Sequence, residues 1–411
     1  MNERSRALAA ASAAPLRRAI GPVREDTGSF RQFILKVASR CNLACDYCYV
    51  YQGHNQEWRT RPRVMSRATI TAIGRRIAEH ARAHQLGTVQ VVFHGGEPLL
   101  AGPDAIDWAV TELGAALPPG TRLQAGIQSN GLLLTDDFLR VLGKHEMFLG
   151  ISMDGDRAAN DRHRRHRDGR GSYAGVDRAL RLLSASQPTL LAGLLCTIDL
   201  ANDPIATYET LARFAPPVID FLLPLANWSH PPPGGQGGPR ATAPLSGTPY
   251  ADWLIPVFDH WYESRDAISI RLFDEIINLL LGGRPSTEII GGGGADFSVI
   301  ETDGTIDSSD TLTFAHEGAA STGLSVFRDS FDDVLAHPAV AGQRRGAREL
   351  CAACLSCPVA SVCGGGQYAH RYRAGSGFDN PSVYCADLYR VIGHIGRRVL
   401  ADLRATRGRK P

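Results

Sequence analysis

Three cysteines stand close together in the stretch Cys41-Asn-Leu-Ala-Cys45-Asp-Tyr-Cys48. Three thiolates at CxxxCxxC spacing can wrap one cubic [4Fe–4S] cluster and leave one iron without a protein ligand. An iron with an open position can coordinate a further molecule, so the spacing predicts a reactive metal site. A zinc site is the alternative, because His54 could supply the fourth ligand that zinc requires.

A second group of cysteines lies near the C-terminus. Its members are Cys351, Cys354, Cys357, Cys363 and Cys385. The odd total of nine cysteines, without a secretory signal, argues against a disulfide framework and for metal ligation in a reducing cytosol. A zinc ribbon is the alternative for this group. Cys196 stands alone in an apolar run, which predicts a buried, inert thiol.

Short polar motifs follow three predicted strands. They read Gly95-Gly96-Glu97-Pro98, Gln128-Ser129-Asn130-Gly131 and Ser152-Met153-Asp154-Gly155. Two adjacent glycines let the backbone approach a ligand, and Glu97 offers an acceptor for an ammonium group. Taken alone, such a motif can equally be a plain turn. Arg164 lies in a basic run that could be a solvated loop or could hold a carboxylate.

The elements that must position these motifs alternate from Phe33 onward. Strands are expected at Phe33–Val37, Val89–Phe93, Gln124–Gln128, Phe148–Ser152, Leu190–Ile198 and Ile219–Leu223. Amphipathic helices are expected at Ser66–His84, with Ser66 as N-cap, and at Pro103–Gly114, Thr135–Gly143, Tyr173–Ser186 and Pro204–Phe214. Six βα units in a row predict an α/β fold whose parallel sheet closes into a partial (β/α)6 TIM-type barrel.

The remaining sequence predicts a second, smaller region. A Pro- and Gly-rich loop covers Pro231–Gly247, and helices are expected at Tyr250–Arg265, Ile270–Leu281 and Leu388–Leu403. The stretch from Met1 to about Arg24 lacks the pattern of a signal peptide, so residues 1–30 are expected to be a disordered tail. We expect domains at 31–230, 231–285 (linker and bridging helices) and 286–411.

Bulk properties exclude some classes of function. The 411 residues are 44% hydrophobic, yet none of the apolar runs reaches the eighteen residues of a membrane span. The net charge of +2 arises from interspersed acidic and basic residues, which does not suggest a nucleic-acid partner. A cytoplasmic protein without membrane or nucleic-acid partners is expected.

The first cysteine group and the motifs after the strands resemble the radical SAM superfamily. The resemblance implies that S-adenosylmethionine (SAM) binds the open iron of a cluster held by Cys41, Cys45 and Cys48, and that reductive cleavage yields a 5′-deoxyadenosyl radical. It implies that Tyr47 and, more loosely, Leu225 contact the adenine. It places the SAM amino group at Gly95-Gly96-Glu97-Pro98 and the SAM carboxylate at Arg164. The remaining cofactor positions implied are Ser129, Asn130, Ser152 and Asp154.

The second cysteine group resembles the SPASM domain, an iron–sulfur extension of peptide-modifying radical SAM enzymes. Cys354, Cys357, Cys363 and Cys385 match the ligands of its distal cluster, and Cys351 is extra and could replace one of them. Three positions where the proximal cluster would have cysteines differ. They are Gln367, Ser309 and the glycine run Gly291–Gly294. The chain is therefore expected to keep one auxiliary [4Fe–4S] cluster. Asp310 matches the base of a sulfatase-maturing family, but its neighbouring cysteine is absent, and a solvent-facing turn aspartate is the alternative.

Within SPASM proteins, the stretches 363–373 and 377–385 look most like the FxSxx-system (FxsB-like) maturases. The resemblance implies a ribosomal precursor peptide as substrate, a carbon–carbon (cyclophane-type) cross-link as product, and a flavodoxin- or ferredoxin-type reductant. Other radical outcomes stay open: thioether formation, epimerisation, decarboxylation, or formylglycine formation on a sulfatase. A non-enzymatic zinc-binding interaction protein is the rival of a different class.

Overall fold

The computed structural model describes residues 28–53, 55–233, 247–264, 266–293, 296–346 and 349–407. The predicted tail up to residue 27, residues 234–246 of the predicted loop and His54 lie outside these ranges. The chain divides into two compact units. The N-terminal unit comprises Asp26–Leu194 and Ala295–Gly342, and the C-terminal unit comprises Leu195–Gly294 and Gln343–Pro411.

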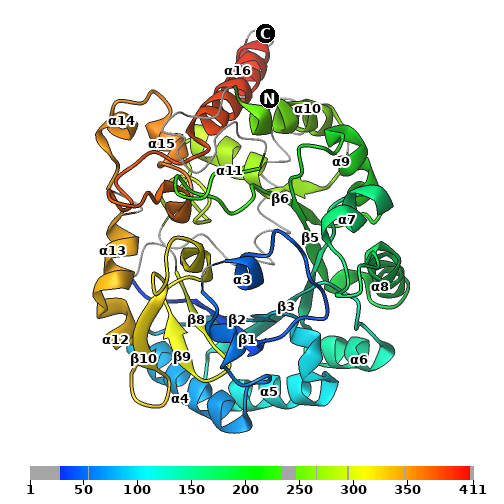
Figure 1. Cartoon of the computed structure of the whole chain (residues 1–411), viewed down its shortest axis with the longest axis vertical. Coiled ribbons are helices and arrows are strands. Elements are labelled where there is room, and N and C mark those ends of the chain that lie inside the picture. Colours follow the sequence, from blue (N-terminus) through cyan, green and yellow to red (C-terminus); the bar gives the residue numbers. More distant parts are fainter. Residues whose placement is uncertain are drawn as a thin grey trace. The chain divides into compact units, whose positions relative to one another are not determined.

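The N-terminal unit is built on parallel strands that alternate with helices (Figure 1). The strands β1 (Gln32–Ala38), β2 (Thr88–Gly95), β3 (Arg122–Ser129) and β4 (Phe148–Ser152) pair in this order, all parallel. The helices are α4 (Arg67–Ala83), α5 (Pro103–Ala116), α6 (Asp136–Lys144), α7 (Arg157–His163) and α8 (Tyr173–Ser186). This is the mixed α/β architecture of a partial TIM-type barrel, as predicted. Helix α7 includes the first residues of the basic run, and Arg164 is its C-cap.

Local capping explains where several of these helices begin. The Ser66 hydroxyl accepts a 3.0 Å hydrogen bond from the Thr69 amide at the start of α4, as predicted. Thr135 caps α6 and Asp156 caps α7 in the same way. The apolar face of α4 is buried, which fixes how this helix packs.

A later part of the chain returns to extend the same sheet. Strand β8 (Phe297–Ile300) pairs in parallel with β1, and β9 (Thr305–Asp307) and β10 (Ser321–Ser325) follow in antiparallel pairing. The 3-10 helix η4 (Asp310–Phe314) and the helix α12 (Phe331–Ala336) complete this segment. Strand β1 therefore has a neighbour on both sides, and the cysteine loop leaves from its carboxyl end.

The C-terminal unit is mainly helical. The chain enters it through β5 (Leu191–Thr197), and β6 (Val218–Leu222) pairs in parallel with β7 (Ser269–Ile270). Its longer helices are α9 (Pro204–Ala212), α10 (Pro249–Glu263), α11 (Arg271–Leu280) and α16 (Cys385–Arg407). Phe258 and Phe273 pack edge to face with ring centroids 5.3 Å apart, and join α10 to α11.

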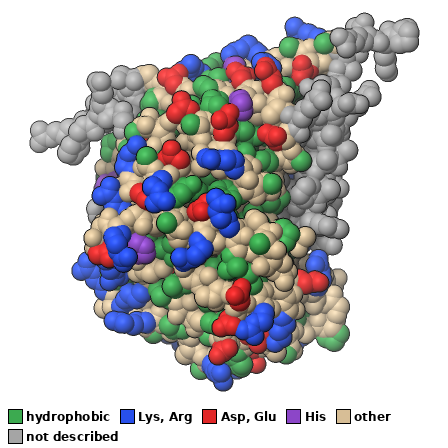
Figure 2. Space-filling model, turned by 90° about the vertical axis from the view of Figure 1, so that its right-hand side faces the viewer, with side chains coloured by type: hydrophobic (Ala, Val, Ile, Leu, Met, Phe, Trp, Pro, Cys, Tyr) green, Lys and Arg blue, Asp and Glu red, His purple; other side chains and the backbone are tan. Residues whose placement is uncertain are grey.

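Short elements complete the description. They are α3 (Tyr49–Gln52), η1 (Glu57–Arg59), η2 (Pro98–Ala101), η3 (Pro188–Leu190), α13 (Pro338–Gly346), α14 (Ala352–Leu355), α15 (Ala360–Cys363) and η5 (Tyr368–Arg371). Among the described helices, we find none with the length and apolar character needed to span a membrane. On the face shown in Figure 2, basic and acidic side chains are mixed.

Candidate active site

The first cysteine group lies in the loop between β1 and α3 of the N-terminal unit. The Leu43 amide donates to the Cys41 Sγ at 3.4 Å, and the Asn130 side-chain amide lies 3.8 Å from the same sulfur. Burial raises the pKa of Cys41 to about 12 and that of Cys45 to about 11. The free thiols are therefore protonated, and only a bound metal would ionise them. Amide donors that point at a sulfur are typical of iron–sulfur ligands, so the loop fits such a cluster.

The two glycines of the motif after β2 let it pack against the cysteine loop. The Gly96 amide donates to the Ala38 carbonyl at 2.8 Å, and the Glu97 amide donates to the Arg40 carbonyl at 2.9 Å. A Cβ on Gly96 would lie 1.9 Å from the Tyr51 hydroxyl, and one on Gly95 would lie 2.2 Å from the Ala38 oxygen. These glycines allow the backbone of the motif to approach the backbone of the cysteine loop closely. The motif and the cysteine loop are therefore packed directly against each other.

Glu97 is buried and its carboxylate is held from several sides. One oxygen accepts from the Ser129 hydroxyl at 2.7 Å, and the other accepts from the Asn130 amide at 2.9 Å. The Leu99 amide also donates to Glu97 at 3.0 Å, just after Pro98 opens η2. Burial raises the pKa of Glu97, although these donors oppose the shift. The structure thus joins the motifs after β2 and β3 into one rigid group.

Tyr47, Asp154 and Arg164 also meet, although they are far apart in sequence. The Tyr47 hydroxyl donates to the Asp154 carboxylate at 2.5 Å, and Arg164 Nη1 donates to the Tyr47 hydroxyl at 2.8 Å. Arg164 is buried, and its Nε has no hydrogen-bond partner among the described residues. A buried, unpaired guanidinium donor beside the cysteine loop is suited to an anionic ligand.

Ser152 and Leu225 are the remaining predicted cofactor residues. Ser152 ends β4, and its hydroxyl accepts from the Gln128 side chain at 3.1 Å. Leu225 follows β6 in the C-terminal unit and is half-buried. Cys196 is buried, as predicted.

A buried charge network lies at the carboxyl ends of β1 and β8. The Lys36 amino group, on β1, lies 2.9 Å from the Glu301 carboxylate, and Arg61 lies 2.9 Å from the same oxygen. The Tyr49 hydroxyl donates to Asp310 at 2.6 Å. Burial alone would raise the pKa of Asp310, but Lys36, His94 and this hydrogen bond together lower it. Asp310 is therefore an ionised carboxylate in a buried position.

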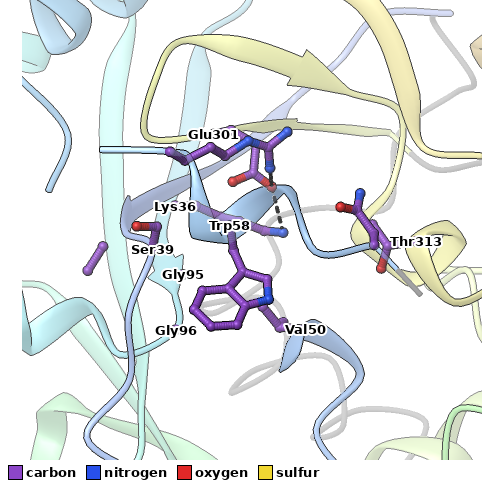
Figure 3. A pocket seen from close by; sticks show the side chains of 11 residues that line it. Lys36, Ser39, Val50, Trp58, Gly95, Gly96, Glu301 and Thr313 are labelled. Atoms are coloured by element: carbon purple, nitrogen blue, oxygen red, sulfur yellow. Dashed lines mark ion pairs between the residues drawn. The ribbon is translucent and has the colours of Figure 1, made fainter. Parts of the chain in front are cut away.

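A small cavity of about 30 Å³ opens beside this network (Figure 3). Lys36, Trp58 and Glu301 line it together with the backbone of Gly95 and Gly96. Figure 3 shows the Lys36 amino group between the Trp58 indole and the Glu301 carboxylate. The glycine motif and the charge network therefore border the same space, which has room for about two water molecules.

The second cysteine group is brought together in the C-terminal unit. Cys351 precedes α14, Cys354 lies in it, Cys363 ends α15 and Cys385 begins α16, with Cys357 between the two short helices. Burial raises the pKa of Cys354 to about 12, and Cys351, Cys385 and Cys363 add to the rise. Burial also raises the pKa of Cys385, and Cys357 and Cys351 add to that rise. Thiols that raise one another's pKa lie within electrostatic range, as a shared metal site requires.

Arg371 organises the loop after Cys363, and sequence reasoning missed it. All three glycines of Gly364–Gly366 have positive φ, and the buried Arg371 guanidinium donates to each of their carbonyls, at 2.5–3.2 Å. One guanidinium can serve three carbonyls because its planar fork carries five N–H donors. The only sequence signal was an arginine eight residues after a glycine-flanked cysteine.

The positions that lack proximal-cluster cysteines are filled by other contacts. The Gly291 amide donates to the Cys363 carbonyl at 3.0 Å, and a Cβ on Gly364 would lie 2.0 Å from the Gly292 nitrogen. The Gln367 side chain donates to Glu288 at 3.3 Å. In the N-terminal unit, Ser309 is buried and its hydroxyl pairs with Thr311.

Comparison with known proteins gives one family match and several similar enzymes. Residues 35–204 match the family model of the radical SAM superfamily. A serine-type anaerobic sulfatase-maturating enzyme of Klebsiella aerogenes is 26% identical over 91% of this chain and 86% of its own length. A cysteine-type anaerobic sulfatase-maturating enzyme of Clostridium perfringens is 24% identical over 66% of this chain and 72% of its own length.

Solved structures show the same fold. Native anSMEcpe with bound AdoMet has a TM-score of 0.77 at 19% identity, over 90% of this chain and 98% of that one. Streptococcus suis SuiB bound to precursor peptide SuiA has a TM-score of 0.54 at 14% identity, over 94% of this chain and 81% of that one. The resemblance to radical SAM enzymes is confirmed, whereas the assignment to the FxSxx-system maturases is not. The family match at residues 35–204, together with the cysteine loop and the motifs packed around it, identifies this chain as a radical SAM enzyme that uses a [4Fe–4S] cluster and SAM.

Proposed function

We propose that this enzyme oxidises a serine or cysteine side chain of a peptide substrate to formylglycine. The observation that carries the proposal is the pair Tyr49–Asp310, in which an ionised and buried carboxylate is held within the unit that contains the cysteine loop. The sulfatase-maturating relatives support this reaction over the cross-link expected from the sequence.

The cofactors fit the residues described above. Cys41, Cys45 and Cys48 would hold the cluster, Glu97 and Arg164 would face the amino and carboxylate groups of SAM, and Tyr47 would lie beside the adenine. When reduced and bound, this pair supplies a radical able to take a hydrogen atom from an unactivated C–H bond. A flavodoxin- or ferredoxin-type protein is the proposed source of the electron.

Asp310 has the properties of the base that the oxidation requires. Conversion of a serine to an aldehyde removes a hydrogen atom from Cβ, a proton from the hydroxyl and one further electron. A cysteine loses the same three particles to give a thioaldehyde, which water then hydrolyses to the aldehyde with release of hydrogen sulfide. The lowered pKa keeps Asp310 unprotonated and ready to accept that proton. The Tyr49 hydroxyl holds the carboxylate by its hydrogen bond to Oδ2.

The C-terminal cysteines would hold the group that accepts the remaining electron. Cys354, Cys357, Cys363 and Cys385 would hold one auxiliary [4Fe–4S] cluster, whose chemistry is one-electron transfer. The close packing of Gly364 on Gly292 and the Gln367–Glu288 contact support a single auxiliary cluster, because backbone and polar side chains occupy the positions of the missing ligands.

A carbon–carbon cross-link between two side chains is the second candidate. The likeness of the stretches 363–373 and 377–385 to the FxSxx-system maturases favours it. This reaction also removes two hydrogens, so the loss of mass alone does not distinguish it from oxidation of a serine.

The test uses the reconstituted enzyme with SAM, dithionite and synthetic peptides that contain serine, cysteine or an aromatic residue beside an aliphatic one. Deuterium at Cβ of the modified residue should appear in 5′-deoxyadenosine. An aminooxy reagent should label the product of the serine and cysteine peptides, because only an aldehyde forms an oxime. A product that loses two hydrogens, resists the reagent and does not fragment between two residues would instead establish the cross-link. Failure to transfer deuterium from any of these peptides would overturn both reactions.

A further inference from the structure

A cluster of metal-ligand side chains lies in the N-terminal unit away from both cysteine groups. His80 lies in α4, His84 follows its last residue, and Asp332 lies in the first turn of α12. The three ligand atoms, one from each residue, lie within 4.8 Å of one another. We propose that these residues form a binding site for a divalent transition-metal ion of the zinc class.

The two histidines have the spacing that a helix needs to present both rings to one ion. Residues four apart on an α-helix lie one turn apart on the same face. The rings of His80 and His84 have centroids 4.3 Å apart. His80 Nδ1 and His84 Nε2 each lie 2.8 Å from the same Asp332 oxygen. Two imidazole nitrogens and one carboxylate oxygen are ligands that zinc and its neighbours accept.

The contacts of His80 direct one of its two ring nitrogens toward this cluster. His80 Nε2 lies 3.2 Å from the Phe30 carbonyl, which can only accept a hydrogen bond, whereas Nδ1 faces the Asp332 oxygen. When Nε2 donates to this carbonyl, Nδ1 keeps the lone pair that a metal ion needs.

The surroundings hold the cluster in place. The hydrogen bond from a ligand histidine to a backbone carbonyl is the usual outer contact of a zinc site, since it fixes the ring and its tautomer. The His80 ring also packs against Phe30, Phe33 and Phe331. Ser330 and Asp333 form a capping box that sets the start of α12, and Asp332 is not used in it.

The exposure of the ligands suits entry of an ion from solvent. The His80 side chain is 1% exposed, whereas those of His84 and Asp332 are 28% and 50% exposed. Water can therefore complete the coordination. A bound ion would clamp α12 to α4, and so would fasten the segment that carries β8 and Asp310 to the first part of the same unit.

The test measures zinc binding to the reconstituted holoenzyme, whose cysteines carry iron. Iron and zinc are counted by elemental analysis after equilibration with ZnCl₂ and gel filtration, and thermal unfolding is followed by circular dichroism. The wild-type chain should bind one more zinc than the variants His84→Ala and Asp332→Asn, and all three should contain the same amount of iron. Zinc should raise the Tm of the wild-type chain and leave the Tm of both variants unchanged. His145→Ala is the matched control, since His145 pairs with Asp107 outside the cluster, and it should behave as wild type.

Two results would overturn the proposal. One is a wild-type chain that retains no zinc beyond that of the two variants. The other is a gain in Tm with zinc that persists in both His84→Ala and Asp332→Asn. His80 is left unchanged in this test because its removal would also disturb the aromatic packing. Neither result bears on the proposed oxidation, which is measured on peptides without added zinc.

Discussion

The Tyr49 hydroxyl donates a 2.6 Å hydrogen bond to Asp310, across 261 residues of sequence. Tyr49 directly follows the last cysteine of the first group, and Asp310 begins η4. The contact therefore ties the proposed base to the segment that holds the cluster, and the position of one depends on the other.

Tyr49→Phe should separate peptide oxidation from SAM cleavage. Loss of one charge-assisted hydrogen bond, worth about 1.5–3 kcal/mol, leaves Asp310 free to turn away from the substrate. We expect formation of modified peptide to fall about tenfold or more, while 5′-deoxyadenosine still forms. The ratio of the two products is measured by chromatography. Tyr262→Phe removes a Tyr–Asp hydrogen bond of 2.8 Å in the C-terminal unit and should leave the ratio unchanged. If the ratio of modified peptide to 5′-deoxyadenosine were the same in both variants, Tyr49 would have no role in positioning Asp310.

Arg164→Lys should weaken SAM binding. Lysine lacks the planar fork that can hold a carboxylate and Tyr47 together. A loss of about tenfold to a hundredfold in affinity is expected from the usual value of a charged hydrogen bond. Equilibrium dialysis with labelled SAM gives the Kd, and the iron content shows whether the cluster is retained. The neighbouring Arg165→Lys is the control, because Arg165 is exposed and bonds to the Asp161 carbonyl. Equal Kd values for wild type and Arg164→Lys would contradict the assignment.

Gly96→Ala should disrupt the cysteine loop. Its Cβ would lie 1.9 Å from the Tyr51 hydroxyl and 2.3 Å from the Arg40 oxygen, and the backbone oxygen cannot move without the loop. We expect the iron of the reconstituted protein to fall by about half, to about four per chain, because the second cysteine group is not touched. Gly87→Ala is the matched control, since a Cβ there meets no atom within 4 Å. Full iron in Gly96→Ala would show that the loop tolerates the strain.

Iron counts also assign the ligands of the C-terminal unit. The wild-type chain should bind about eight irons, which corresponds to two [4Fe–4S] clusters. Cys363→Ser should reduce the count to about four, whereas Cys351→Ser should leave it unchanged. If the iron content fell in both variants, Cys351 would be a cluster ligand. About twelve irons in the wild-type chain would show that it also binds a proximal auxiliary cluster.

Asp307→Asn should change the pH dependence of stability. Burial, with help from Glu301, raises the pKa of Asp307 from 3.8 to about 6, and its Oδ2 has no partner among the described residues. The folded state therefore favours the protonated form, and this contribution is lost as pH rises from about 4 through about 6. Asparagine has no charge to bury, so the variant should be more stable than wild type by up to about 3 kcal/mol at pH 7.5.

Denaturant unfolding at pH 5, 6 and 7.5 measures this difference. It should shrink as the pH falls, because wild-type Asp307 then regains its proton. A difference that stays constant from pH 5 to pH 7.5 would show that Asp307 does not titrate in this range.

The sequence predicted the local elements well. Strand β4 and helix α8 have the expected bounds, and Ser66 caps α4, because periodicity and capping depend on neighbouring residues. Short β-like pieces were expected after Gly291–Gly294, but the sequence did not predict that β8 pairs with β1, because this pairing depends on residues far apart in the chain. Terminal helix α16 begins at Cys385, three residues before the expected start, since a cysteine gives no helical signal.

The same distinction applies to the candidate site. The spacing of Cys41, Cys45 and Cys48 marks a local pattern, and it can be seen in one line of sequence. The role of Lys36 cannot be predicted in this way, because a lysine in an apolar strand is explained only by its ion pair with Glu301, which is distant in the sequence. The same holds for Arg371, because it donates to three glycine carbonyls that come together only in the folded loop.

The pairing of β8 with β1 has a consequence for how the chain is made. About 260 residues must be translated after β1 before its second neighbour exists, which takes roughly 13–50 s at common rates of synthesis. During that time one edge of β1 is open to other strands, and Lys36 has no carboxylate to meet. A nascent chain of this enzyme therefore passes through a stage that is exposed to aggregation, and so would any fragment that ends before Phe297.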